Sequence, residues 1–181
     1  RLTWLIPCMV GMMLSATVMI VSEAHFDAAL FVVLVPFVPL IGATGGNSGV
    51  QISTVIVRGF ASGELGSTKL LRALFREGRI ALAMAPICGF GAWLLVTLTL
   101  PHFLTEVGGA ASGIDHRRVA ISVGTAMTAA ILIAAFLGIS LPFTFRRFKI
   151  DPAIASGPLV TTMNDILSVS VYMIIAILIA R

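Results

Sequence analysis

Five apolar stretches, each long enough to cross a lipid bilayer, limit what this sequence can fold into. Hydrophobic residues make up 58% of its 181 positions and charged residues only 11%, against roughly 45–50% and about 25% in soluble domains. A helix of about 20 apolar residues crosses a bilayer because it satisfies its own backbone groups. The sequence therefore predicts an all-α, polytopic membrane protein, a single domain over residues 1–181 with five transmembrane helices. We expect the spans at about residues 4–21, 28–57, 80–100, 119–143 and 153–180.

Basic residues gather in the segments that would lie on one side of the membrane. Nine lysines and arginines fall at position 1, in residues 58–79 and in residues 146–149, whereas the other side carries three. Because cytoplasmic loops are enriched in Lys and Arg, we expect a cell inner membrane or plasma membrane protein with a cytoplasmic N-terminus and an outside C-terminus. Residues 68–78 alternate basic and apolar side chains, which predicts an amphipathic helix lying on the cytoplasmic leaflet. The +4 net charge resides largely in these loops and offers no folded basic face for nucleic acid.

The second apolar stretch contains a polar, glycine-dense segment from Gly42 to Gln51. Pro36 and Pro39 precede it and predict a kink or a local unwinding of the helix. In helical geometry four polar residues share one face, a polar stripe made of Asn47, Gln51, Thr54 and Arg58. Lipid cannot solvate such a stripe, so we expect it to face protein or to line an ion path.

Glycines four residues apart recur around this segment, as Gly42/Gly46, Gly45/Gly49 and Gly59/Gly63. This spacing allows close helix packing in membranes. A chain of this size rarely encloses a path alone, so the pattern suggests a homodimer in the lipid bilayer.

Asp165 is the one acidic residue deep inside an apolar stretch. A charge at the bilayer centre costs about 2.5–3.5 kcal/mol on insertion scales, so such a residue needs a reason to be there. Polar residues surround it at helical spacing, namely Thr161, Thr162, Ser168 and Tyr172. In a symmetric dimer Asp165 would meet its copy, and two carboxylates without a basic side chain at the same depth form a site for a cation.

The types of ligand atom indicate which cation. Carboxylate, amide, hydroxyl and carbonyl oxygens suit Mg²⁺, with Mn²⁺ and Ca²⁺ as further possibilities. Mg²⁺ gives up water reluctantly, which fits few acids and many hydrogen-bonding groups. The sequence lacks the Cys and His clusters that favour Zn²⁺ or Cu⁺.

Other interpretations stay open at this point. Asp165 could fix helix packing through neighbouring hydroxyls, and Asn47 and Gln51 could join helices. A transport protein could be a channel or a proton- or sodium-coupled carrier, since both need the same midplane site, and a membrane anchor without transport is the third alternative. The sequence shows no nucleophile–base pair or nucleotide-binding loop, so we do not expect an enzyme.

Two motifs resemble the membrane domain of the MgtE-type magnesium channels. The first is Pro36-x-x-Pro-x-x-Gly-x-x-Gly-Gly-Asn-Ser-Gly-Val-Gln51, followed by Val57-Arg-Gly59. The second is Ile150-Asp-Pro-Ala-x-Ala-Ser-Gly-Pro158, followed by Thr161-Thr-x-x-Asp165. The resemblance covers essentially the whole chain, and the combination of motifs is specific.

The resemblance implies a homodimer of five-span subunits with a path for Mg²⁺ along the dimer axis. It implies that Asp165 is the main metal ligand, with Asn47, Gly46 and the Thr161 turn contributing nearby; Gln51 completes the expected set from the polar stripe. Family members usually carry a cytosolic Mg²⁺-sensing region with paired CBS domains, whereas this sequence begins at its first span. We therefore expect either an excised membrane domain or a sensor-less form, and a possible cytosolic regulatory domain would lie outside this chain.

Overall fold

The structure is a computed structural model that describes residues 2–62, 67–107 and 113–180. All regular elements within these ranges are helices, which confirms the all-α prediction. The helices are α1 (Leu2–Glu23), α2 (Ala28–Leu34), α3 (Phe37–Ala61), α4 (Ser67–Val107), α5 (His116–Arg147) and α6 (Pro152–Ile179).

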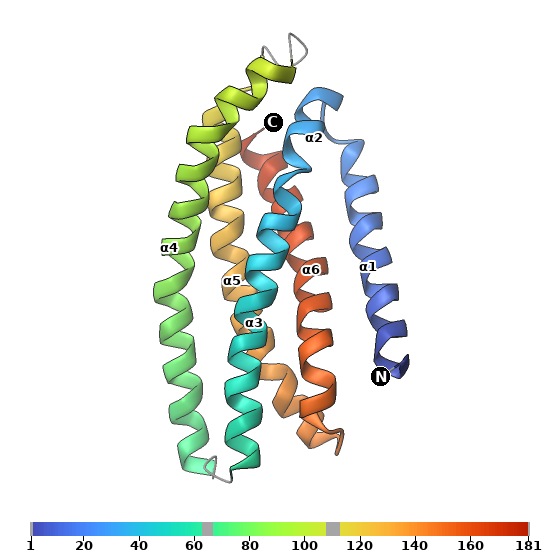
Figure 1. Ribbon diagram of the computed structural model, residues 1–181, viewed down its shortest axis with the longest axis vertical. Coiled ribbons are helices and arrows are strands. Elements are labelled where there is room, and N and C mark those ends of the chain that lie inside the picture. Colours follow the sequence, from blue (N-terminus) through green and yellow to red (C-terminus); the bar gives the residue numbers. More distant parts are fainter. Residues whose placement is uncertain (1, 63–66, 108–112, 181) are drawn as a thin grey trace.

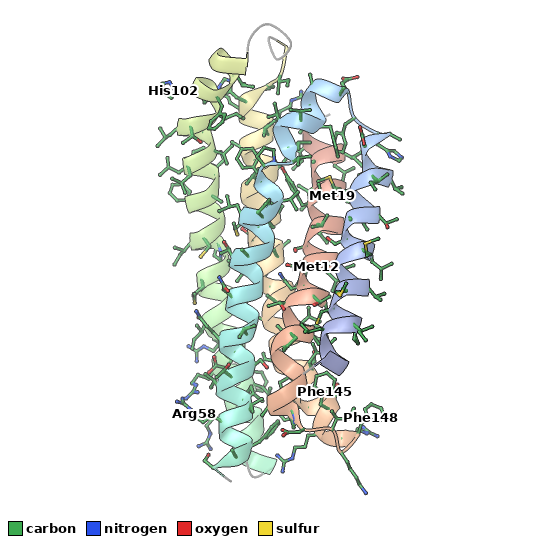
Figure 2. The ribbon with its side chains drawn as sticks, turned by 45° about the vertical axis from the view of Figure 1, so that its right-hand side comes forward. Met12, Met19, Arg58, His102, Phe145 and Phe148 are labelled. Atoms are coloured by element: carbon green, nitrogen blue, oxygen red, sulfur yellow. The ribbon has the colours of Figure 1, made fainter. Side chains whose placement is uncertain are left out.

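Five helical segments are long and apolar enough to cross a membrane, as predicted. They cover Leu5–Glu23, Ala28–Ala61, Leu74–Leu104, His116–Arg147 and Gly157–Ile179. An odd number of crossings sends the two termini to opposite ends of the bundle, as Figure 1 shows. Arg58, Phe145 and Phe148 lie at one end and His102 at the other (Figure 2).

Helix α5 occupies the centre of the bundle and α1 its edge. Helix α5 packs against α3, α4 and α6, whereas α1 contacts mainly α6, and Figure 1 shows α1 standing at one side. Small residues line the buried side of α5, among them Gly124, Ala130, Ala134 and Gly138. They let the neighbouring helices approach closely, because lipid supplies no hydrophobic force between helices and packing must hold them together.

The second span is broken at Val35 and Pro36, which confirms the effect predicted for the two prolines. Pro39 has no N–H to donate to the Val35 carbonyl. The Val38 N–H donates to that carbonyl instead, at 3.1 Å. The carbonyl of Leu34 then accepts the hydroxyl of Tyr172 from α6 at 3.0 Å, and both residues are fully buried. The Tyr172 hydroxyl of α6 thus gives a hydrogen bond to the Leu34 carbonyl, which the break in the second span leaves without its helical partner.

Replacement of Tyr172 with phenylalanine should therefore lower the stability of the folded protein. The variant keeps the ring but leaves the Leu34 carbonyl unpaired in an apolar interior, at a cost of about 1–3 kcal/mol. Thermal unfolding in detergent would measure the loss. Ser170→Ala is the control, because the Ser170 hydroxyl donates only to Ile166 of its own helix. Equal melting temperatures for the two variants would contradict this role of Tyr172.

The start of α4 differs from the prediction. The structure joins residues 68–78 to the third span in one helix of 41 residues, which also runs without a break through Pro86, Gly89 and Gly91. Such a helix is about 60 Å long, more than the roughly 40–45 Å of a whole bilayer. Glu77, Ala81 and Ala85 are buried at a spacing of four residues, so the seam against the bundle begins within the first turn of the span Leu74–Leu104. Residues 68–78 are therefore continuous with the third span and do not form a separate helix, whereas their place on the cytoplasmic leaflet stays a prediction.

The start of α6 agrees with the sequence. The Asp151 carboxylate accepts the N–H of Ala153 at 2.9 Å, and Pro152 occupies the first turn. Aspartate is a preferred residue for such a cap, and proline fits the first turn because it lacks an N–H that would otherwise need a partner. The cap fixes where α6 begins and therefore the depth at which Asp165 lies.

Candidate cation site

Helix α3 has a glycine face and a polar face. The glycine face consists of Gly42, Gly45, Gly46 and Gly49, all buried. The polar stripe predicted from the sequence, Asn47, Gln51, Thr54 and Arg58, lies on the opposite side and is exposed in the single subunit. The two glycine pairs expected to pack between subunits therefore pack within one subunit. The third pair ends at Gly63, outside the described residues.

Two polar residues of α6 rest on this glycine face. A Cβ atom added to Gly42 would lie 3.1 Å from Oδ1 of Asp165, and one added to Gly46 would lie 3.4 Å from Cγ2 of Thr161. Gly42 and Gly46 are four residues apart on α3, and Thr161 and Asp165 are four residues apart on α6. The glycine row and the polar row therefore lie alongside each other in register. The glycines thus bring the α3 backbone against the carboxylate and the threonine.

Asp165 lies at a partly exposed position between two neighbouring helices. Thr162 of α6 packs against Gly11 of α1, whereas Asn164 of α6 contacts α3. With 3.6 residues per turn, Asp165 and Thr161 lie on the part of α6 between the side that faces α1 and the side that faces α3. Asp165 is eight residues from the start of the span at Gly157, about 12 Å along the helix. The carboxylate therefore lies well inside the apolar span without being enclosed by its own subunit.

The structure brings together Asp165, Thr161 and Gly46 of the predicted residues, but not Asn47 and Gln51. The latter two are exposed, and their side chains make no hydrogen bond within the described part of the chain. The Thr161 hydroxyl donates to the Pro158 carbonyl at 2.8 Å, which leaves its oxygen lone pairs as an acceptor.

Asn164 is a buried residue in contact with α3, and the sequence did not single it out. Its Nδ2 donates to the carbonyl of Gly42 at 3.3 Å, and the residue is 0% exposed. Its Oδ1 has no hydrogen-bond partner among the described residues, and an unpaired buried acceptor costs about 1–3 kcal/mol. The sequence feature that could have indicated this contact is an amide side chain inside a membrane span, next to the lone acid.

A single subunit does not assemble enough ligands for a closed metal site. Within the described ranges there is no group of three or more His, Cys, Asp or Glu side chains that could hold a metal. One carboxylate, one hydroxyl and the backbone of a glycine face are hard oxygen donors, and these suit a hydrated Mg²⁺ or similar ion.

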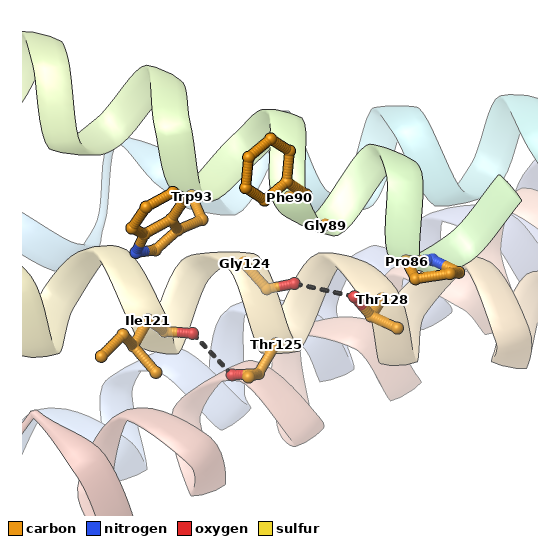
Figure 3. A pocket seen from close by; sticks show the side chains of 8 residues that line it. All are labelled: Pro86, Gly89, Phe90, Trp93, Ile121, Gly124, Thr125 and Thr128. Atoms are coloured by element: carbon orange, nitrogen blue, oxygen red, sulfur yellow. Dashed lines mark hydrogen bonds between the residues drawn. The ribbon is translucent and has the colours of Figure 1, made fainter.

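A separate groove lies between α4 and α5 and differs in chemistry (Figure 3). Pro86, Gly89, Phe90, Trp93, Ile121, Gly124, Thr125 and Thr128 line it. Both threonine hydroxyls donate to carbonyls of their own helix, at 2.7 Å to Ile121 and 3.0 Å to Gly124. The residues that line the groove carry no charged side chain, so it is not a candidate for the cation.

The fold and this site together define a multi-span helical membrane protein with one partly exposed carboxylate inside its last apolar span. A sequence profile described as "MgtE: Divalent cation transporter" matches residues 38–175. The chain belongs to the MgtE family.

Three relatives carry the name "Magnesium transporter MgtE". The protein of Bacillus subtilis (strain 168) is 31% identical over 178 residues, which are 97% of this chain and 36% of that protein. Those of Thermus thermophilus and Enterococcus faecalis are each 29% identical, over 97% and 100% of this chain and 35% and 36% of their own lengths. The chain thus spans about a third of the length of these relatives. The relatives are transporters by name, which agrees with the prediction that this chain is not an enzyme.

Proposed function

We propose that this chain forms the path of a divalent cation channel that conducts Mg²⁺ into the cytoplasm. The observation that carries the proposal is the position of Asp165, a lone carboxylate deep in a span, partly exposed and resting on the glycine face of α3. A carboxylate at this depth is costly and marks an ion pathway by default. The names of the relatives support Mg²⁺ as the transported ion.

The path would lie on the axis of a homodimer. One carboxylate cannot balance a divalent ion, whereas two copies of Asp165 related by two-fold symmetry can. The polar stripe of α3 is uncovered in the single subunit, and in lipid it needs protein or water beside it. A second copy of this chain would supply both the second carboxylate and the missing wall.

The ion would keep most of its water. Asp165 of each subunit would bind the hydrated ion, and Thr161 and the backbone at Gly46 would accept hydrogen bonds from its water shell. Asn47 and Gln51 would meet hydrated ions elsewhere along the path, because they lie on the exposed face of α3. Mn²⁺ and Ca²⁺ present the same hard chemistry and would compete with Mg²⁺.

Mg²⁺ flux into proteoliposomes tests the function. Uptake into vesicles that hold a Mg²⁺ indicator should exceed uptake into protein-free vesicles and should persist without any proton or sodium gradient, because a channel needs only the gradient of its own ion. Uptake that requires a proton or sodium gradient would show a coupled carrier instead. Uptake equal to that of protein-free vesicles would overturn the proposal.

We also propose that the chain lies in the plasma membrane with its N-terminus in the cytoplasm. Arg58, Arg76, Arg79, Arg146 and Arg147 belong to the end that this orientation makes cytoplasmic. In intact cells, and in a background without Cys8 and Cys88, a cysteine replacing Arg147 should react with an impermeant thiol reagent only after permeabilisation. A cysteine replacing His116 should react directly, and the reverse pattern would invert the orientation.

A further inference from the structure

Asn164 and Asp165 are consecutive residues of α6, and both contact Gly42 of α3. The amide Nδ2 of Asn164 donates to the Gly42 carbonyl at 3.3 Å. The carboxylate Oδ1 of Asp165 lies 3.1 Å from the position of a Cβ on the same glycine. Helices α3 and α6 lie side by side in the bundle (Figure 1). A slide of α6 along α3 would therefore alter both contacts together.

The Asn164 amide occupies a notch that only a glycine leaves open. A Cβ on Gly45 would lie 2.8 Å from Nδ2 and 3.2 Å from Oδ1 of Asn164. The Ser168 hydroxyl donates to the Asn164 backbone carbonyl at 2.6 Å, which reinforces the turn that carries both residues. The Asn164 side chain is thus held by α3, and the Ser168 hydroxyl bonds only the backbone that carries it.

Packing alone does not explain an amide at this position. Oδ1 of Asn164 is buried without a hydrogen-bond partner among the described residues. A leucine has nearly the same shape and would leave no unpaired oxygen, and the Gly42 carbonyl, which lies inside α3, would keep the helical N–H four residues further on as its partner. The contribution that leucine cannot make is the hydrogen bond to the Gly42 carbonyl.

We propose that Asn164 is a positioning residue of the cation site, which holds Gly42 of α3 in place as the wall against which the Asp165 carboxylate rests. This inference rests on the proposed function. Asn164 does not touch the ion; it sets the direction of the carboxylate that does. Its loss should weaken ion binding without unfolding the protein.

Asn164→Leu tests this role in the whole chain, with Mg²⁺ as the probe. The Mg²⁺ concentration for half-maximal uptake should rise about tenfold, which corresponds to ~1.4 kcal/mol, while the melting temperature without Mg²⁺ stays at or above that of the unaltered chain. The concentration that gives half of the Mg²⁺-dependent thermal stabilisation should rise by the same factor. Asn164→Ala serves as the second variant, and its half-saturating concentration should rise likewise even if its melting temperature falls.

Two further variants separate positioning from packing. Ser170→Ala also removes a hydroxyl from α6, but that hydroxyl bonds within its own helix, so its half-saturating concentration should not change. In an Asp165→Ala background, Asn164→Leu should have no additional effect on Mg²⁺-dependent stabilisation, because Asn164 acts through the carboxylate.

A half-saturating concentration within twofold of the unaltered chain, in both Asn164 variants, would overturn the inference. This outcome is distinct from failure of the proposed function. That failure appears in the unaltered chain, as absence of both Mg²⁺ uptake and Mg²⁺-dependent stabilisation, and it would overturn both.

Discussion

Replacement of Asp165 with alanine is expected to reduce Mg²⁺ uptake into proteoliposomes to the level of protein-free vesicles. A hydrogen bond to a charged group contributes about 1.5–3 kcal/mol, which corresponds to roughly ten- to hundredfold in affinity. A symmetric site loses two carboxylates at once, so the combined loss should exceed a hundredfold. The measurement is initial uptake over a range of Mg²⁺ concentrations.

The same variant should be as stable as the unaltered chain or more so. A charge near the bilayer centre costs about 2.5–3.5 kcal/mol, and no hydrogen bond or ion pair of the Asp165 side chain within the described residues offsets it. Lost uptake together with an unchanged or higher melting temperature is therefore the signature of a functional residue. Asp165→Asn keeps the shape without the charge and should also fail to conduct, whereas Ser170→Ala should conduct normally. Undiminished uptake by Asp165→Ala would rule out the carboxylate as the ion site.

The spans were predictable because they depend on local composition. A bilayer imposes the same length and the same lack of polar side chains on every helix that crosses it, so the five stretches could be located without knowledge of their neighbours. The break before Phe37 and the cap at Asp151 were also predictable, because proline and aspartate act on their own backbone. Local chemistry determined these features.

Features that depend on contacts between distant segments were not predictable. The continuity of α4 follows from the burial of Glu77, Ala81 and Ala85 against other helices, which the sequence of α4 does not reveal. The hydrogen bond of Asn164 to Gly42 joins residues that are 122 positions apart. Asp165 stood out because a charge in lipid is exceptional by itself, whereas an amide in lipid acquires a role only from its partner.

The glycines of α3 show why spacing alone did not identify their partner. A glycine pair four residues apart fits any close helix, in the same subunit or in another. In this chain Gly42 and Gly46 face Asp165 and Thr161 of the same subunit. The glycine face therefore packs against the acid within one subunit, and the polar stripe on the other side of α3 stays uncovered there.

Gly138 of α5 is the position where a single methyl group should damage the fold most clearly. A Cβ atom there would overlap the carbonyl oxygen of Gly49 on α3 and would lie 3.2 Å from its carbonyl carbon. Backbone atoms cannot rotate aside as a flexible side chain can, so α3 must move away from α5. Overpacking of this kind costs about 1–3 kcal/mol, and we expect Gly138→Ala to lower the melting temperature and the recovery of monodisperse protein in size-exclusion chromatography.

The matched control for Gly138→Ala is Gly91→Ala on α4, because an added Cβ at Gly91 has no neighbour within 4 Å. Alanine is favoured over glycine inside a helix by about 0.5–1 kcal/mol, so this variant should be neutral or stabilising. Gly138→Ala should also reduce Mg²⁺ uptake, because Gly49 lies two helical turns from Gly42 on the same helix and its displacement lifts Gly42 from Asp165. Here uptake and stability fall together, whereas in Asp165→Ala uptake falls alone. A Gly138→Ala protein that melts with the unaltered chain would show that α3 and α5 do not meet at these two glycines.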